Sequence, residues 1–537
     1  MAAGAECHFS LLALPDPCLL AVLQSCAATD QRSVFRAARA HPRLHQAAVL
    51  ALRSISARAC QQPTVDGMLL YLKKHGEHVD SIDLRGDYGA VLRELPPSMH
   101  LSSLQLEMLR LQLQRGAGFH GVLGAAATVA ALKKLRLRSC QLHSGGWEAA
   151  DGVLTAALSV LPAGLQHLSI SNLTFDSRPL RLPTTVLQQL QQLTCLELAN
   201  VELQGPDEAS SALQPLQALT RLADLRLAGN AAVSITANML SGTHHMTRMQ
   251  LPATVCSNSF EPGALAGKTR LQHLDLALCR VPGGAAGVAQ LLSHLQPLHQ
   301  LTHLDLMRTL RDVSEDTPPA AAYAALTTSS KLQHLNISTN RLPAHVWQHM
   351  FPVDRQLLHL TSLDISAIRQ PLDLAGGFAP APEGSRLVSC CPSLQSLSLV
   401  CLQFEGLLPA LQGLSTLHTL GVGAANCNAE HLLQLTQLKQ LSTLKFRSPP
   451  YVDLTCRVSC TDTTGHLRLY VVNKRKDGEM KLPLHVLPLA CHSRIISNCF
   501  FPTLYVHFLL DVHLHVHFPV ACVGSCHLSD AAAAAAA

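Results

Sequence analysis

A six-residue leucine pattern, LxxLxL, recurs along most of this chain. Strong copies, with leucine or another apolar residue at the sixth place, begin at Leu132, Leu165, Leu193, Leu222, Leu271, Leu301, Leu332, Leu360, Leu394, Leu417 and Leu441. A methionine copy begins at Met246, and weaker copies begin at Val79 and Leu101. Because successive starts from Leu132 onward lie 23 to 34 residues apart, the chain is predicted to be an array of similar units.

The spacing within each copy predicts one short β-strand per repeat. Alternate residues of a strand point to opposite sides, so Leu274 enters a core while His273 and Asp275 face away from it. The segments between strands, such as 285–295 and 148–161, carry apolar residues at helical spacing. They return the chain through right-handed crossovers, and closer packing of strands than of helices curves the stack into a horseshoe.

The longer motif resembles the leucine-rich repeat family. LKKLRLRSCQL carries Cys140 and Leu142, LADLRLAGN carries Asn230, and LQHLNISTNRL carries Asn340 and Leu342 at the later places of the motif. The asparagines are expected to bond loop backbone that the turns leave unpaired. The resemblance implies an α/β fold, a leucine-rich repeat solenoid with parallel strands on the concave face of a horseshoe.

Composition limits the expected partners and compartment. Hydrophobic residues make up 48% of the 537 residues and aromatic residues only 4%, so leucine, valine and alanine must build the core. A charged fraction of 14% and a formal net charge of +5 give no indication of nucleic-acid binding. No basic residue precedes the first apolar run, so we expect no signal peptide, a cytoplasmic protein and reduced thiols for the 18 cysteines.

Residues 11–56 lack the repeat motif and predict three short helices. The first is expected to begin at Pro15 and Asp16. Asp30 suits the N-cap of the second helix, which should stop before Pro42. The apolar residues expected inside are Leu19, Leu20, Val22 and Leu23, then Val34, Phe35 and Ala38, then Leu44, Ala48, Leu52 and Ile55.

This helical stretch resembles an F-box. The residues that match the motif are Leu14, Pro15, Asp16, Leu19, Leu20, Val22, Leu23, Asp30, Arg36, Arg39 and Leu44. The departures are Pro17 in place of an acid, Cys26 in place of a leucine, and the lack of a tryptophan after Arg39. The resemblance implies that an Skp-type adaptor, and through it a cullin, is bound by Leu14, Pro15, Leu19, Leu20 and Leu23.

Two functions follow from these resemblances. An F-box joined to leucine-rich repeats implies a substrate-recognition subunit of an SCF-type ubiquitin ligase that holds a protein target on the concave face. The alternative is a structural scaffold whose N-terminal helices only cap the array. The Ala-, Gln- and His-rich style is similar to that of leucine-rich proteins of green algae, which implies the cytoskeleton or the ciliary axoneme as another location.

Equivalent positions of neighbouring strands form rows across the concave face, because parallel strands lie about 4.8 Å apart. One predicted row contains His273, His303 and His334, and the row beside it contains Asp275, Asp305, Asn336 and Asp364. Upstream, Lys134, Arg136 and Arg138 are expected to make the face basic. These residues either form a solvated surface or bind a basic or amide-rich partner, with affinity falling below about pH 6.5 as the histidines become positive.

No motif predicts catalysis, a cofactor or a metal site. Gly267, Lys268 and Thr269 resemble the end of a P-loop, but a strand is expected where a phosphate-binding helix is required. His345 and His349 lack the adjacent glutamate of a metalloprotease helix. The chain is therefore expected to be a binding protein and not an enzyme.

The sequence divides into a helical module at 1–60, a solenoid at 61–455 and a tail at 456–537 that is expected to be irregular. The tail contains an apolar run from Cys499, but Asp511 and several histidines would be costly inside a membrane, so no span is expected. Its histidines and cysteines match no compact zinc-finger spacing; they include His513, His515, His517, Cys522, Cys526 and His527.

Overall fold

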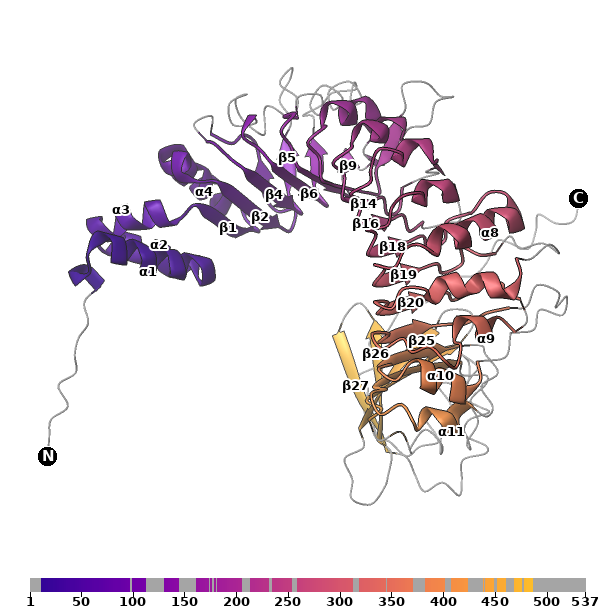
Figure 1. Ribbon diagram of the computed structural model, residues 1–537. Coiled ribbons are helices and arrows are strands. Elements are labelled where there is room, and N and C mark those ends of the chain that lie inside the picture. Colours follow the sequence, from indigo (N-terminus) through magenta and orange to yellow (C-terminus); the bar gives the residue numbers. More distant parts are fainter. Residues whose placement is uncertain are drawn as a thin grey trace, which may run out of the picture.

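One long sheet runs through the protein and forms the inner side of an arc (Figure 1). The computed structural model describes residues 11–96, 99–112, 130–143, 161–172, 174–175, 178–179, 181–204, 213–230, 234–253, 258–311, 318–343, 345–369, 382–400, 407–423, 438, 440–448, 452–459, 468–475 and 478–485. Within these residues the sheet has 18 strands.

The strands of this sheet follow one another in sequence order. They are β1 (Ser54–Ala59), β2 (Ser81–Gly86), β4 (Ser103–Glu107), β6 (Lys134–Arg138), β8 (His167–Ser171), β12 (Cys195–Ala199), β14 (Asp224–Arg226), β16 (Arg248–Gln250), β18 (His273–Asp275), β19 (His303–Asp305), β20 (His334–Asn336), β21 (Ser362–Asp364), β22 (Ser396–Leu399), β23 (Thr419–Gly423), β24 (Thr443–Ser448), β25 (Val452–Ser459), β26 (Arg468–Arg475) and β27 (Gly478–His485). Every pairing from β1 to β24 is parallel, as an array of one strand per repeat requires.

Shorter strands lie beside this sheet. A five-stranded sheet contains β3 (Val91–Leu92), β5 (Arg110–Gln112), β7 (Gln141–His143), β9 (Thr174–Phe175) and β10 (Arg178–Pro179). Two further pairs are β11 (Arg181–Pro183) with β13 (Glu202–Gln204), and β15 (Ser234–Ile235) with β17 (Ser259–Phe260).

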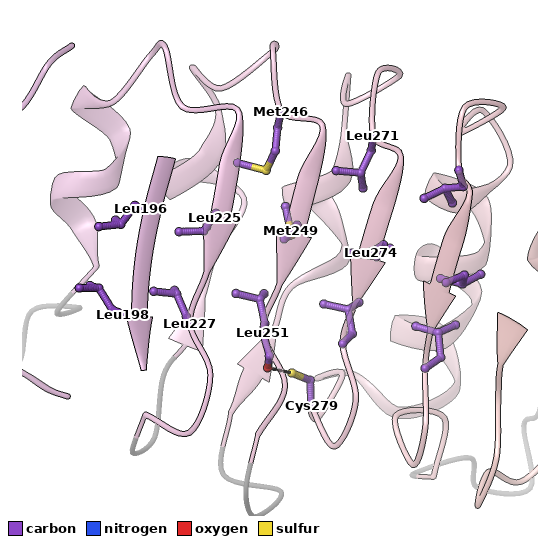
Figure 2. Packing of buried hydrophobic residues seen from close by; sticks show 14 of the residues in the cluster. Leu196, Leu198, Leu225, Leu227, Met246, Met249, Leu251, Leu271, Leu274 and Cys279 are labelled. Carbon is purple, nitrogen blue, oxygen red and sulfur yellow. Dashed lines mark hydrogen bonds between the residues drawn. The ribbon is translucent and has the colours of Figure 1, made fainter. Parts of the chain in front are cut away.

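The repeated leucines build a continuous core behind the sheet. Figure 2 shows equivalent leucines of neighbouring strands on the same side, with Leu225 beside Met249 and Met249 beside Leu274. Met246 and Met249 occupy leucine places and are fully buried. The flexible methionine side chain fills the same space, so the MTRMQL copy is a true repeat.

The returning segments lie on the outer side of the arc (Figure 1). The helices among them are α8 (Gly284–Leu295), α9 (Val346–Met350), α10 (Gly384–Cys390) and α11 (Leu407–Leu411). The 3-10 segments are η3 (Thr184–Gln189), η4 (Gln214–Ala218), η5 (Asn238–Leu240), η6 (Pro262–Leu265) and η7 (Ala320–Thr327). The α8 helix confirms the prediction for 285–295, whereas 148–160 lie outside the described residues. The fold is an α/β leucine-rich repeat solenoid, as predicted.

Polar side chains inside the turns tie each repeat to the one before it. Asn230 accepts from Val201 N at 2.9 Å and donates to Leu198 O at 2.8 Å, which confirms its predicted role. Asn340 accepts from Leu310 N and donates to Leu306 O, both at 2.8 Å. The same bond to the preceding repeat is made by Cys140 to Leu106 O, Cys279 to Leu251 O and Thr309 to Leu276 O.

The strands bend away at a residue with a left-handed backbone. This residue is the eighth of the repeat, counted from the first leucine, in Met108, Ser139, Asn172, Asn200, Gly229, Leu278, Arg308, Thr339 and Ala367. Its N–H donates to the next repeat, for example from Thr339 to Ser366 O at 2.7 Å. Thr339 has φ 62°, which is strained for a β-branched residue.

The N-terminal helices form a small module at one end of the arc (Figure 1). It contains η1 (Leu11–Ala13), α1 (Asp16–Thr29), α2 (Gln31–Ala40) and α3 (Pro42–Ala51), and α4 (Gln62–His75) with η2 (Gly76–His78) follows β1. Asp30 caps α2 by accepting from Arg32 N and Ser33 N, as predicted. Leu19, Leu23, Val34, Leu44, Ala47, Ala48, Ala51 and Leu52 form a core distinct from the core of the array.

Five apolar residues of this module differ from the prediction, among them Phe35 and Ala38, which are half-buried against its core. Ile55 does not belong to the third helix, because α3 ends at Ala51 and Ile55 is buried in β1. Leu20 is only half-buried and Val22 is exposed, because the helical period turns Leu19 and Leu23 to the core instead. The first strand of the sheet therefore lies before residue 61, where the solenoid was expected to begin.

The C-terminal end of the sheet changes direction after β24. The backbone of β25, β26 and β27 forms antiparallel pairs that extend the sheet. An irregular segment is predicted from residue 456, and within it the backbone of 468–475 and 478–485 is extended. Residues 486–537, with the apolar run and its histidines and cysteines, lie outside the described residues.

Candidate protein-binding face

Strand register places the predicted histidines and acids in two adjacent rows on the concave face. His273 is paired with His303 and His303 with His334. Asp275, Asp305, Asn336 and Asp364 are paired in the same succession. The rings of His273 and His303 stack with centroids 4.0 Å apart and planes 10° apart, and His334 lies 6.0 Å from His303 at a tilt of 31°.

Each acidic or amide side chain of the second row bonds the backbone two residues later. Oδ1 accepts from Ala277 N in Asp275, from Met307 N in Asp305 and from Ser366 N in Asp364, at 2.9 to 3.0 Å. Asn336 donates from Nδ2 to Oδ2 of Asp305 at 2.9 Å. The carboxylates are thus held by backbone and amide donors.

Burial moves the pKa values of the two rows in opposite directions. Desolvation raises the pKa of Asp275 to about 6 and also raises that of Asp305. Desolvation lowers the pKa of His273 to about 4, with further contributions from the positive charge on His303, Arg248 and Arg226. At neutral pH His273 is therefore an uncharged ring, and Asp275, with a pKa of about 6, changes charge near pH 6.

The upstream strands carry the predicted basic side chains, but acids compensate them. Arg138 Nε lies 3.7 Å from Glu107 Oε1, and Arg136 Nη2 lies 3.4 Å from Glu197 Oε2. Similar pairs join Arg85 to Asp83 and Glu107, and Arg226 to Asp224. The upstream face therefore carries both charges, because Glu197 and Glu107 lie beside Arg136 and Arg138. Lys134 lies on β6 with its side chain exposed.

The five residues predicted to bind an adaptor differ in their exposure. Leu19 and Leu23 are 0% and 3% exposed, so they belong to the module's own core. Leu14 and Leu20 are half-buried, and Pro15 is exposed at the start of α1. Of the five predicted contact residues, only Leu14, Pro15 and Leu20 have side chains that are accessible to a partner.

The segment that resembled a P-loop has a structural role. Gly267 has φ 72°, and the chain enters β18 with no helix after Thr269, as the sequence analysis expected. Lys268 is 1% exposed, and its Nζ donates to Leu240 O at 2.7 Å. Burial lowers the pKa of Lys268. His345 lies at the N-terminal end of the short helix α9, and His349 lies within it.

Neither a metal-binding cluster nor a membrane-spanning helix is found in the described part of the chain. No three His, Cys, Asp or Glu side chains there are grouped closely enough to hold a metal ion. None of the helices there combines the length and the apolar character needed to cross a bilayer.

No family model and no curated protein matches this chain. Among solved structures it is similar to a leucine-rich repeat protein of Leptospira interrogans, with 17% identity, 76% of this chain and 87% of that chain covered, and a TM-score of 0.45. It is also similar to the PEPR1 chain of the PEPR1–AtPEP1 structure, with 16% identity, 68% and 45% covered, and a TM-score of 0.42. Because these TM-scores are below 0.5, the fold assignment rests on the strand order and register described above.

Proposed function

We propose that this solenoid is a protein-binding module whose concave face, across β18 to β21, binds a basic segment of a partner protein. The observation that carries this proposal is a difference between two parts of one sheet. From β2 to β14 the acids Asp83, Glu107, Glu197 and Asp224 each lie within 4.0 Å of an arginine. Among the ion pairs of the described residues, none involves Asp275, Asp305 or Asp364. These three carboxylates can therefore accept a cation from outside the chain.

The neighbouring histidines suit the same partner. A neutral imidazole stack offers a flat surface against which an arginine guanidinium or a lysine stem can pack. Arg248 next to His273 would repel a cation at one end of the row. The favoured position for the cation is therefore over Asp305 and Asp364, where Arg248 is two or more strands away.

The test measures binding of a fluorescently labelled arginine- and lysine-rich peptide to the full chain by anisotropy. Replacing Asp305 and Asp364 by asparagine should weaken binding by about fivefold or more, because two carboxylates that have no cation partner among the described residues are lost. The matched control replaces Asp83 and Asp224 by asparagine, which changes the net charge equally but removes acids that already have partners. Equal affinity of wild type and the first variant, or equal loss in both variants, would contradict the proposal.

The N-terminal module supports a finer function, the docking of an Skp-type adaptor in an SCF-type ubiquitin ligase. The helix α1 has apolar residues on both faces, and after Asp16 it has no charged side chain. Of the eight large hydrophobic side chains exposed in the described residues, five lie in residues 11–70: Leu11, Leu12, Val22, Leu50 and Leu70. Exposed apolar side chains are thus more frequent here than in the rest of the described chain, which is compatible with a protein partner. The accessible contact set is Leu14, Pro15, Leu20 and Val22.

The adaptor test uses Val22→Glu, because Val22 is 38% exposed and outside the module's core. Gln24→Glu is the matched control on the exposed surface of the same helix. Recombinant adaptor and cullin should be retained by wild type and by the control, and lost with Val22→Glu. If folded wild type retains no adaptor, the ligase function is excluded.

The alternative is a scaffold, cytoskeletal or of the ciliary axoneme, whose helices only cap the array. One observation favours it. Gln31 of α2 donates to Ser54 O at 2.8 Å and accepts from Ser56 N at 2.9 Å, so its amide pairs with β1 as a neighbouring strand would. This cap protects the first edge of the sheet and is compatible with docking on the other side of the module.

A further inference from the structure

The N-terminal module carries a surplus of positive charge that its own acids do not compensate. Residues 11–78 contain eight Lys and Arg and four Asp and Glu, a difference of +4. Asp16 binds Arg43 at 2.6 Å, and Asp66 accepts from Gln62 at 2.9 Å. Glu77 lies 3.4 Å from His78. Asp30 is occupied as the cap of α2, and the pKa of Asp30 is lowered mainly by the hydrogen bonds from Ser33 and least by the charge of Arg36.

Three of the uncompensated arginines lie on one face of α2. Arg32, Arg36 and Arg39 are exposed, and their spacing of four and three residues places them along one side of the helix. Val34 on the opposite side is buried in the core of the module. The three guanidinium groups therefore form a stripe about 10 Å long that points away from the protein.

A pocket at the α2–α3 corner continues this stripe. Its polar lining comes from Arg39, His41, His45 and Gln46, and its apolar lining from Ala38, Ala40 and Pro42. His41 accepts from Arg43 N through Nδ1, which leaves its Nε2 as a donor.

Further basic side chains lie near His45 of the pocket. The ring of His45 contacts that of His75 at the end of α4, with centroids 5.4 Å apart, and Lys73 and Lys74 beside it are exposed. The pKa of His75 is lowered by burial first and then by the positive charges of Lys74, His45 and His78, with only Glu77 acting in the opposite sense.

We infer that the α2 stripe and the α2–α3 pocket form a docking site for an acidic segment of a partner protein, with an apolar side chain of that segment in the pocket. Carboxylates would bind Arg32, Arg36 and Arg39 through charge-assisted hydrogen bonds. The alanine and proline lining favours a peptide over a single-stranded nucleic acid, whose bases commonly stack on exposed aromatic rings. Phe35 and Tyr71, the aromatic residues nearest this site, are packed against each other and against the core of the module.

This site is separate from the concave face and from the apolar side of α1, so its test is independent of the proposed function. The probe is a short fluorescein-labelled peptide of glutamates with one central leucine, titrated with the full chain at low and at high salt. We expect binding that weakens with salt. Arg36→Glu with Arg39→Glu should reduce affinity by about tenfold or more, because two attractive contacts become repulsive.

The matched control is Arg270→Glu with Arg341→Glu, two exposed arginines of the array, which changes the net charge by the same amount. Circular dichroism checks that both variants fold. Loss of affinity in the α2 variant alone, together with weaker binding of a peptide in which glycine replaces the leucine, supports the proposal. No binding by wild type, equal loss in the control, or equal or tighter binding of a single-stranded oligonucleotide of the same charge overturns it.

Discussion

Lys268 offers a direct test of how this array accommodates a charge in its core. Its side chain is 1% exposed, and the only hydrogen bond described for Nζ goes to Leu240 O. That carbonyl also accepts from Thr243 Oγ1 at 2.8 Å. Replacing Lys268 by methionine therefore removes a buried charge without leaving Leu240 O unpaired, and the unbranched methionine fills the space of the lysine stem.

The free energy of unfolding should rise by about 1 to 2 kcal/mol in Lys268→Met at neutral pH, since exchanging buried charge for apolar volume is often stabilising. The gain should depend on pH. Burial lowers the pKa of Lys268 in the folded state, so the unfolded chain binds more protons between that pKa and the ordinary lysine value. Wild-type stability should rise with pH across this alkaline window, and the advantage of methionine should disappear above it.

Urea unfolding of both proteins, followed by circular dichroism from neutral pH to about pH 10.5, measures this difference. Lys331→Met is the matched control, because Lys331 is exposed and its Nζ donates to the side chain of Gln300. It should change stability by less than about 0.5 kcal/mol at every pH. A destabilised Lys268→Met, or an advantage that does not shrink with pH, would refute the account of Lys268 as a costly buried cation.

Three further perturbations test other parts of the fold and the site. Thr339→Gly should raise stability by up to about 1 kcal/mol in thermal melts, because it relieves a β-branched residue with a left-handed backbone. Thr361→Gly should lower stability by a similar amount, because Thr361 is not among the residues with a left-handed backbone and glycine only adds freedom to the unfolded chain. Asn340→Ala should lower stability by about 2 to 4 kcal/mol, since it removes the partner of the buried Leu310 N–H and of the Ile337 carbonyl, and Asn340→Thr should lose less. Binding of the basic peptide should weaken as pH falls through about 6, where Asp275 becomes protonated, and Asp275→Asn should reduce this dependence; His273, with a pKa of about 4, stays neutral there.

The sequence predicted the fold well because the leucine period fixes which side of each strand is buried. Once Leu274 and Leu304 are in the core, His273 and His303 must be neighbours in a row, and the register bears this out. Local signals were equally sufficient for the cap at Asp30. These features depend on one repeat and its neighbour, which a pattern can describe.

The compensation of charge upstream could only partly be predicted. Glu107 is paired with Arg138 in the register of β4 and β6. Equivalent positions of neighbouring repeats lie side by side, so this contact is predictable from the sequence. Arg136 and Glu197 are different, because β8 lies between their strands. The small side chain of Ser169 stands between them, bonds Glu197 at 2.9 Å and leaves room for the arginine to reach across. Such a contact depends on side-chain size in a third repeat.

The leucine pattern also does not predict which polar side chains are buried, although the energetic effect of each buried group is local. Each repeat contacts only its neighbours, so the stability of an array is approximately a sum over repeats and interfaces. Lys268 precedes β18 and Asn340 follows β20, with all of β19 between them. The double variant Lys268→Met with Asn340→Ala should therefore equal the sum of the two single effects to within about 0.5 kcal/mol in urea unfolding. A larger discrepancy would mean that these repeats share a strained arrangement, and that the charge at Lys268 is compensated through the core and not by its own turn.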